Sequence, residues 1–289
     1  KELKRWAKTQ QVDTPLFMFP SKSYIKPEPY GTILIIGPFN YPVQLLFEPL
    51  IGAIAAGNNA IIKPSELTPH VAQVVRKVIE DVFASDFVAV VEGGVEETQT
   101  LINLPFDYIF FTGSENVGRI VYEAASKNLV PVTLELGGKS PVIVDETANI
   151  KVASDRISFG KFTNAGQTCV APDYILVNRK VKNELIQAFK KSIEEFYGKN
   201  IQNSPDFGRI VNTKHFNRLS ELLAIHRNEV IFGGHTDENE QYIEPTILDG
   251  ITPQSKIMEE EIFGPLLPII VYDDFNEAID IIQSKSKPL

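Results

Sequence analysis

Short apolar runs alternate with amphipathic stretches along most of the chain. Runs such as residues 32–37 are almost continuously apolar, which favours strands buried on both faces of a parallel sheet. In the first half the pattern predicts strands at residues 32–37, 59–63, 87–91, 108–111 and 131–135. It predicts helices between them, at residues 42–56, 68–83, 95–103 and 114–127. This alternation predicts an α/β fold with a doubly wound, mostly parallel sheet.

The pattern starts again after the glycine pair Gly137-Gly138. It predicts further strands at residues 141–144, 174–177, 242–248 and 267–271, and further helices at residues 150–162, 180–197, 214–226 and 276–283. Residues 1–30 are polar and contain several prolines, so we expect a connecting arm there. The sequence therefore predicts two domains, a doubly wound one at residues 1–136 and a second α/β domain at residues 137–289.

Composition and charge exclude several classes of function. The net charge is −9 and there is no sustained basic run, which argues against a nucleic-acid surface. No apolar run reaches the roughly 18 residues that a membrane span needs. The four histidines and the single cysteine do not have metal-site spacing, so we expect no metal. One cysteine is consistent with a reducing compartment, and we expect the cytoplasm.

The single cysteine, Cys169, lies in a segment with unusual composition. It follows Gly-Gln-Thr, a small and polar sequence that allows a turn to expose the next side chain. A lone cysteine forms no disulfide within its own chain. It is therefore either a buried, inert thiol or a nucleophile, and composition alone favours the inert thiol.

Polar residues follow two of the predicted strands, where ligands bind in open α/β sheets. Asn40 lies between a strand and a helix, as a turn or cap residue or as an amide donor for an oxyanion. Lys63 ends the next strand and by itself is typical of a solvated lysine. With Glu66, however, it has the chemistry to bind the two hydroxyls of a ribose.

Two further segments have residue types that suit a nucleotide. Gly113 and Ser114 follow a strand and open a helix that contains Gly118, so backbone N–H groups there are placed to face a phosphate. The spacing fits neither the dinucleotide fingerprint nor a P-loop, and an ordinary turn explains it equally well. Glu261 and Phe263, before Gly-Pro, combine a carboxylate with an aromatic ring, although three successive acids usually indicate a solvated face.

Glu135 is a carboxylate between two leucines in a predicted strand. Such a position is disfavoured for a charge unless the group is paired or functional. A general base is one interpretation, and a carboxylate bound by the N–H groups of the following glycines is the other.

Taken together, these segments resemble the aldehyde dehydrogenase superfamily. The segment from Phe162 to Val170 is similar to the cysteine signature of the family, and Leu134 to Lys139 is similar to its glutamate signature. The forms Lys-Pro-Ser-Glu, Gly-Lys-Ser-Pro and Cys-Val-Ala-Pro-Asp-Tyr resemble the class 3, fatty-aldehyde-type branch. The resemblance extends from about Pro29 to Leu289.

The resemblance implies oxidation of an aldehyde to a carboxylic acid with NAD, or with NADP, through a cysteine thiohemiacetal and a thioester. Its implied catalytic residues are Cys169 as nucleophile, Glu135 as base and Asn40 as oxyanion donor. Its implied cofactor residues are Lys63, Glu66, Gly113, Ser114, Gly118, Glu261 and Phe263. On this basis residues 1–136 form the cofactor domain and residues 137–289 the catalytic domain.

The same resemblance implies that the parent protein is longer and forms a homodimer. It also implies that this chain lacks an N-terminal helical region and a C-terminal segment of the parent. Aromatic residues near the site suggest a substrate with an apolar tail: Phe39, Tyr41, Phe162 and Phe263. Three alternatives stay open. They are a CoA-acylating aldehyde reductase, a non-catalytic fragment that binds a nucleotide or a partner, and a cysteine hydrolase without a cofactor.

Overall fold

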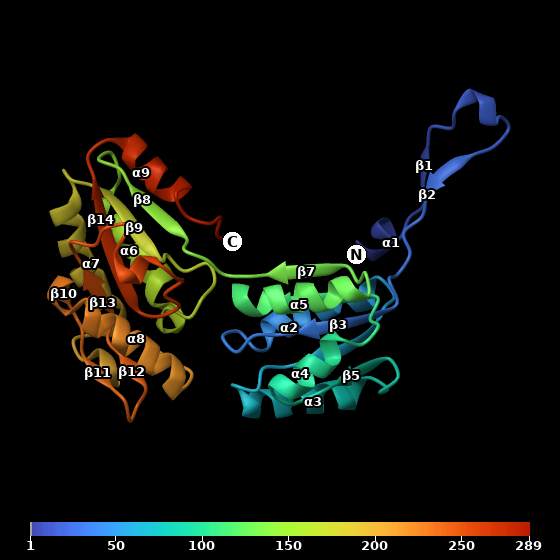
Figure 1. The fold of residues 1–289 in the computed structure, drawn as a ribbon, viewed down its shortest axis with the longest axis horizontal. Coiled ribbons are helices and arrows are strands. Elements are labelled where there is room, and N and C mark those ends of the chain that lie inside the picture. Colours follow the sequence, from blue (N-terminus) through green and yellow to red (C-terminus); the bar gives the residue numbers. More distant parts are fainter. Residues whose placement is uncertain (1) are drawn as a thin grey trace. The chain divides into compact units, whose positions relative to one another are not determined.

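The chain divides into two compact units, Lys1–Glu135 and Leu136–Leu289. The computed structural model describes residues 2–289 (Figure 1). Each unit contains a five-stranded sheet with its own hydrophobic core. The α/β fold with parallel sheets that the sequence predicts is thereby confirmed.

The sheet of the first unit is entirely parallel, in the order β5-β4-β3-β6-β7. Its strands are β3 (Thr32–Ile36), β4 (Asn59–Lys63), β5 (Val88–Val90), β6 (Tyr108–Thr112) and β7 (Val132–Glu135). Its helices are α2 (Gln44–Ala55), α3 (Pro69–Val82), α4 (Val95–Ile102) and α5 (Glu115–Lys127). These elements follow the predicted alternation closely because each buried strand is followed by an amphipathic helix.

The central strand β3 is buried on both faces, as its continuous apolar run predicts. Ile33 and Ile35 pack in one core cluster with Val75 of α3. Leu34 lies between them in sequence, is fully buried and points to the opposite face because strand side chains alternate. Helices therefore cover both faces, and α5 packs against β6 and β7.

The order of the strands creates a switch point beside β3. This strand pairs with β4 on one side and with β6 on the other, so the chain winds outward in both directions from the centre. In open sheets of this kind, ligands bind outside the carboxyl ends of the strands at that point. The residues that follow β3 and β6 are thus the first place to look for a site.

The second unit has a mixed sheet in the order β10-β13-β14-β9-β8. Four parallel strands are β8 (Pro141–Val144), β9 (Tyr174–Asn178), β14 (Leu266–Tyr272) and β13 (Thr246–Leu248), and the antiparallel edge strand is β10 (Val230–Phe232). Its helices are α6 (Ile150–Phe162), α7 (Lys182–Tyr197), α8 (Thr213–Ile225) and α9 (Phe275–Gln283). Short 3₁₀ turns are η2 (Thr163–Gly166), η3 (Ile201–Asn203), η4 (Arg227–Glu229) and η5 (Lys256–Met258).

The connecting arm expected at residues 1–30 contains regular structure that the sequence did not indicate. After a short helix, α1 (Leu3–Trp6), the strands β1 (Gln10–Val12) and β2 (Ser23–Ile25) form an antiparallel hairpin with a 3₁₀ turn, η1 (Leu16–Met18), at its tip. The strands were missed because each is only three residues long and none of their side chains is buried. Local hydrophobic periodicity has no signal in such a segment.

The prediction of a single strand at residues 242–248 is wrong. The structure has two short strands there, β12 (Tyr242–Ile243), which pairs with β11 (Thr236–Asp237), and β13 in the main sheet. Pro245 separates them, since it has no N–H group for a ladder. Glu244 still donates its N–H to His235, whereas Thr246 donates to Pro265. The chain therefore passes from one sheet to the other at the proline.

Among residues 2–289, no helix combines the length and the apolar character that a membrane crossing requires.

Candidate active site

The cysteine loop begins where α6 ends and has an unusual backbone. Asn164 and Ala165 both have φ 53°, and Gly166 has φ 75°. Two of these three successive left-handed residues are not glycine, and each costs about 1–2 kcal/mol relative to a right-handed conformation. Such a conformation persists only where the surrounding structure determines it.

The side chain of Gln167 supplies much of that support. It is 3% exposed, and its Nε2 donates to the carbonyls of Asn164 at 3.1 Å and Arg209 at 2.9 Å. Its Oε1 accepts from the Val211 N–H at 3.0 Å. The amide thus ties the cysteine loop to the segment before α8. Sequence reasoning treated this glutamine only as part of a polar lead-in, although its place two residues before Cys169 was the available signal.

Cys169 lies in a turn after this loop and is partly exposed. The Ala171 N–H donates to the Thr168 carbonyl at 3.0 Å and closes the turn. The thiol is therefore not buried, contrary to the burial that the inert interpretation assumed. Phe162, by contrast, is fully buried in the core of the second unit, so it is not an exposed aromatic wall for a substrate.

The segment with Glu261 and Phe263 lies against the cysteine loop. A Cβ atom added to Gly166 would lie only 2.3 Å from the Gly264 carbonyl oxygen, so the two backbones are in direct contact. Phe263 itself has φ 47°, so it too is left-handed, although its side chain is bulky. The structure therefore brings the predicted nucleophile loop and the Glu261–Phe263 segment together within the second unit.

Glu261 is half-buried and its carboxylate lies on the backbone of the glycine pair. A Cβ atom on Gly137 would come within 2.2 Å of Glu261 Oε2. Burial raises the pKa of the Glu261 carboxyl to about 7, although a hydrogen bond from the Gly138 backbone acts in the opposite direction. Hence this acid does not belong to a solvated face, and its ionisation is sensitive to pH near neutrality.

A buried cation that the sequence reasoning missed lies close to this acid. Lys161, on the last turn of α6, is 1% exposed. Burial lowers the pKa of Lys161 to about 8, and the negative charges of Asp173 and Glu261 oppose that shift. The lysine precedes the conspicuous Phe-Thr-Asn-Ala-Gly-Gln stretch, but its position on a helix gave no local sign of burial.

In the first unit, the predicted residues lie at the switch point of the sheet. Asn40 is half-buried in the bend between β3 and α2, and Gly113 follows β6. Ser114 is the N-cap of α5, and its hydroxyl accepts from the Val117 N–H at 3.4 Å. The Gly118 N–H donates within the helix to the Ser114 carbonyl at 2.9 Å, so Gly118 offers no additional backbone donor.

Lys63 is not the solvated lysine that its isolated position suggested. It ends β4 with a side chain that is 2% exposed, and its Nζ donates to the Pro64 carbonyl at 2.7 Å. The same Nζ lies 3.5 Å from Glu66 Oε2, while the Glu66 side chain is 46% exposed. The structure therefore brings the predicted ammonium and carboxylate together, with the carboxylate facing solvent.

Glu135 is half-buried at the end of β7. Its backbone carbonyl accepts from the Gly113 N–H at 3.0 Å, which places it beside the turn that opens α5. Asn40 and Glu135 thus belong to the first unit, whereas Cys169, Glu261 and Phe263 belong to the second. Among residues 2–289, no group of three or more histidine, cysteine or acidic side chains is placed to hold a metal ion.

Known proteins share both the sequence and the fold of this chain. The 4,4'-diaponeurosporen-aldehyde dehydrogenase of Staphylococcus aureus is 70% identical over the whole chain, which covers 63% of that relative. The aldehyde dehydrogenase family 3 member A2 of Macaca fascicularis is 47% identical over the whole chain, which covers 59% of it. The chain thus spans about three fifths of the length of these relatives.

Solved structures of aldehyde dehydrogenases are similar to this chain in fold. The structure described as the substrate-bound state of Staphylococcus aureus AldH has a TM-score of 0.97 and 69% identity, with 100% of this chain and 63% of that one covered. The Mycobacterium tuberculosis aldehyde dehydrogenase complexed with NAD+ has a TM-score of 0.85 and 32% identity, with 94% and 58% covered. The sequence profile of the aldehyde dehydrogenase family matches residues 4–286. The chain therefore belongs to the aldehyde dehydrogenase family.

Proposed function

We propose that the protein oxidises an aldehyde to the carboxylic acid with NAD+ or NADP+, and that Cys169 is the nucleophile. The observation that carries this proposal is the loop itself. A partly exposed lone thiol follows three left-handed residues, and a buried glutamine and a contact with Gly264 fix that backbone. Strain of this kind is typical of functional sites. Both relatives named above are aldehyde dehydrogenases.

The residues of the first unit fit a dinucleotide. The N-terminus of α5 presents N–H groups and the positive end of the helix dipole to a phosphate, and a side chain on Gly113 would collide with the Phe111 ring. NAD+ is bound by the mycobacterial structure named above.

In the proposed mechanism, Lys63 and Glu66 hold the hydroxyls of the adenine-side ribose, while Gly113, Ser114 and Gly118 accommodate the pyrophosphate. Glu261 and Phe263 hold the ribose and ring of the nicotinamide. The bound nicotinamide would supply the acceptor for the hydride that leaves the substrate carbon. By this assignment residues 1–136 form the cofactor domain and residues 137–289 the catalytic domain.

The protein's own groups account for the other steps. The Cys169 thiolate adds to the aldehyde carbon and gives a thiohemiacetal, whose oxyanion accepts hydrogen bonds from the Asn40 side chain and the Cys169 N–H. One such donor is typically worth about 3–4 kcal/mol of barrier. After hydride loss, Glu135 takes a proton from water, the hydroxide adds to the thioester carbon, and the acid leaves as the thiolate re-forms.

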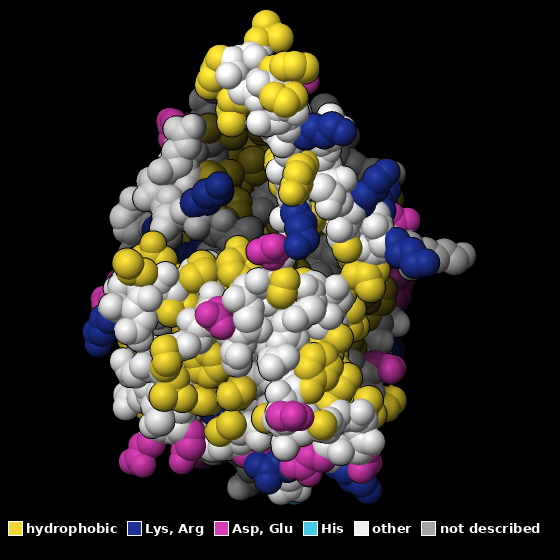
Figure 2. All heavy atoms as spheres, turned by 90° about the vertical axis from the view of Figure 1, so that its right-hand side faces the viewer, with side chains coloured by type: hydrophobic (Ala, Val, Ile, Leu, Met, Phe, Trp, Pro, Cys, Tyr) yellow, Lys and Arg dark blue, Asp and Glu magenta, His cyan; other side chains and the backbone are white. Residues whose placement is uncertain are grey.

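Substrate, assembly and location are part of the same proposal. An apolar, extended aldehyde is supported by the name of the Staphylococcus aureus relative. A homodimer is supported by the hairpin tip, where Leu16, Phe17 and Phe19 are 94%, 88% and 85% exposed. Figure 2 shows hydrophobic side chains gathered on this projection, and exposed patches of this kind mark contact surfaces. A reducing compartment such as the cytoplasm would keep the thiol reduced.

The test is the variant Cys169→Ser, assayed with a panel of aldehydes of increasing chain length and with each cofactor. We expect turnover, followed by NADH or NADPH absorbance, to fall at least about 10³-fold. Cofactor binding measured by calorimetry should stay as in the unsubstituted protein, because the proposed ribose and phosphate residues are remote in sequence. Substantial turnover by the variant would exclude Cys169 as the nucleophile.

A further inference from the structure

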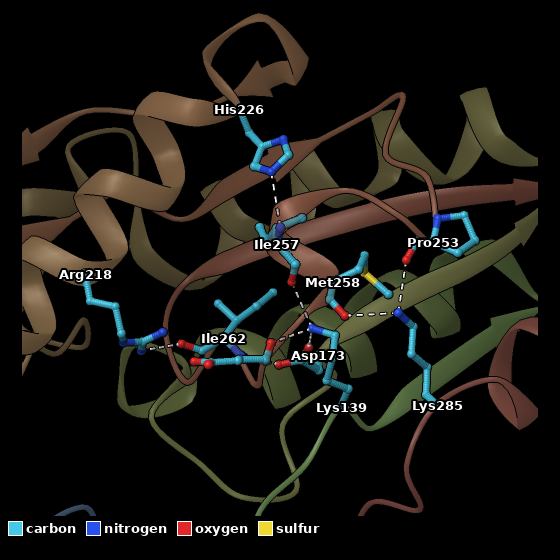
Figure 3. Close-up of polar contacts among 10 residues, drawn as sticks. Lys139, Asp173, Arg218, His226, Pro253, Ile257, Met258, Ile262 and Lys285 are labelled. Atoms are coloured by element: carbon cyan, nitrogen blue, oxygen red, sulfur yellow. Dashed lines mark hydrogen bonds and ion pairs between the residues drawn. The ribbon is translucent and has the colours of Figure 1, made fainter.

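The segment that precedes Phe263 has little secondary structure of its own. Between β13 and β14 the only regular element is the 3₁₀ turn η5. Three cationic side chains from elsewhere in the second unit bind its backbone carbonyls (Figure 3). Lys285 Nζ donates to Pro253 at 3.0 Å and Met258 at 3.2 Å, Arg218 donates to Ile262 at 2.6 Å, and Lys139 Nζ donates to Ile257 at 3.0 Å and Glu260 at 2.9 Å.

Lys139 differs from the other two cations because it is buried with a counter-ion. Its side chain is 8% exposed and its Nζ forms an ion pair with Asp173 Oδ2, whose side chain is 3% exposed. The other carboxylate oxygen, Oδ1, accepts from the Ile262 N–H at 2.8 Å. The Asp173 N–H in turn donates to the Ser140 carbonyl at 2.9 Å. One ion pair therefore ties the glycine-pair segment, the residues after the cysteine loop and the Glu261 segment together.

The ammonium of Lys139 and both carboxylate oxygens of Asp173 make hydrogen bonds. Lys139 donates to one carboxylate and two carbonyls, which satisfies all three of its N–H groups. The contacts fall on Ile257, Glu260 and Ile262, which lie on both sides of Glu261. The remaining charged groups around the pair are Lys161, Arg218, Lys285 and Glu261 itself.

Stability alone is a poor reason to keep such a pair. Burial lowers the pKa of Lys139, because desolvation disfavours its charge, and Asp173 opposes that effect. Replacing a buried ion pair with apolar residues of similar size is often neutral or stabilising. Apolar residues would not reproduce the hydrogen bonds that the pair makes to three defined points of the backbone.

We propose that Lys139 and Asp173 are positioning residues that hold Glu261 and Phe263 in the orientation needed to bind the nicotinamide end of the cofactor. This inference rests on the proposed function of those two residues. It assigns to the pair a role in cofactor geometry that is separate from the reactivity of the thiol. Misplacement by about 1 Å is enough to cost up to about 100-fold in rate.

The test compares three variants of the protein with a matched control. Asp173→Asn keeps the shape and an acceptor oxygen, Lys139→Met removes the donors, and the double variant Lys139→Met with Asp173→Leu replaces the pair by apolar groups. The control is Lys180→Met, which breaks the exposed ion pair with Glu146 in the same unit. Because the double variant leaves neither member of the pair as an unpaired charge, it keeps the test valid where a single variant does not fold.

We expect the KM for NAD+ to rise roughly 10- to 100-fold in the variants of the pair, with a smaller change in the KM for the aldehyde. The isotope effect with an aldehyde deuterated at the reacting carbon should increase, because hydride transfer becomes slower. Alkylation of Cys169 by iodoacetamide without cofactor should keep its rate. Lys180→Met should change none of these quantities.

A purely structural role predicts a different outcome. If the double variant recovers both the KM for NAD+ and the isotope effect of the unsubstituted protein, the positioning role is wrong. It is also wrong if Cys169 alkylation slows in parallel with cofactor use, since the pair would then support the whole site. If the unsubstituted protein neither binds NAD+ nor oxidises any aldehyde, the proposed function itself fails, and that result is distinct from both.

Discussion

Both units contain a five-stranded sheet, but they differ in how they use charge. In the first unit, among the described residues, Lys63 is the buried ionic side chain, and it pairs with a carboxylate that is 46% exposed. The predicted phosphate site at the start of α5 consists of backbone N–H groups, a glycine and a hydroxyl. The Glu66 carboxylate and the Ser114 side chain remain accessible to solvent and to a ligand.

The second unit, by contrast, buries three charged side chains. Lys139, Lys161 and Asp173 are all buried below the segment that carries Glu261, and the loop before Cys169 is held in a strained conformation. Buried, fully hydrogen-bonded ions fix the backbone around them more firmly than exposed ones do. On the assignment proposed above, the thiol and the nicotinamide contacts lie in the second unit, and the ribose and phosphate contacts lie in the more open first unit.

The largest effect is expected for Glu135→Gln, because Glu135 belongs to the first unit and yet has a proposed chemical role. Without the base, hydrolysis of the thioester should limit turnover, and the steady-state rate should fall by roughly 10²- to 10⁴-fold. A burst of NADH before the slow phase, seen by stopped-flow, would show that the cysteine is still acylated. The exposed Glu123→Gln on α5 is the control. An unchanged steady-state rate would remove Glu135 from the mechanism.

The sequence predicted the first sheet well because its information there is local. The run from Thr32 to Ile36 is apolar at almost every position, and the amphipathic helices after β3, β4 and β6 follow at regular spacing. The residues at the ends of these strands could be selected as candidate ligand contacts because the strand ends follow from the same local pattern. In this unit the sequence did not indicate that Lys63 is buried, because its burial depends on segments distant along the chain. It also did not indicate the hairpin, which has no buried face.

The interior of the second unit could not be predicted in this way. Lys139 meets Asp173 34 positions away and the Ile257 and Glu260 carbonyls 118 and 121 positions away. No local period indicates contacts of that range. Gln167 was passed over similarly, because its partner Arg209 is 42 positions distant. Sequence patterns thus selected the proposed reacting groups, while the side chains that hold them required the three-dimensional structure.

A smaller effect should follow from Glu66→Gln in the exposed site of the first unit. The Glu66 carboxylate should repel the additional phosphate of NADP+, but it is 46% exposed and therefore screened. An exposed charge pair contributes about 0.2–1 kcal/mol, so the ratio of kcat/KM for NADP+ to that for NAD+ should rise only about 1.5- to 5-fold. Glu80→Gln, exposed on α3, should leave this ratio unchanged. A change beyond tenfold would indicate that the first unit binds more rigidly than the comparison states.

The smallest effect concerns the half-buried acid of the second unit and is a change in stability with pH. Burial raises the pKa of Glu261 to about 7 from an ordinary value of 4.5. The folded protein therefore binds this proton more tightly than the unfolded chain does. The protonated carboxyl stabilises the fold fully below pH 4.5, and that stabilisation is lost as the pH rises through 7.

Glu261→Gln, which cannot ionise, should consequently raise the Tm relative to the unsubstituted protein at pH 8 but not at pH 5. In a chain of this size each kcal/mol corresponds to roughly 2–4 °C, so a shift of that order is expected in calorimetry at pH 8. Glu260→Gln, whose side chain is exposed next to it, should give the same Tm difference at both pH values. If Glu261→Gln does so as well, the Glu261 carboxylate is already well solvated in the folded protein. The surroundings of Glu261 in the second unit would then resemble the open site of the first. The contrast between an exposed site in one unit and buried charges in the other would fail at Glu261.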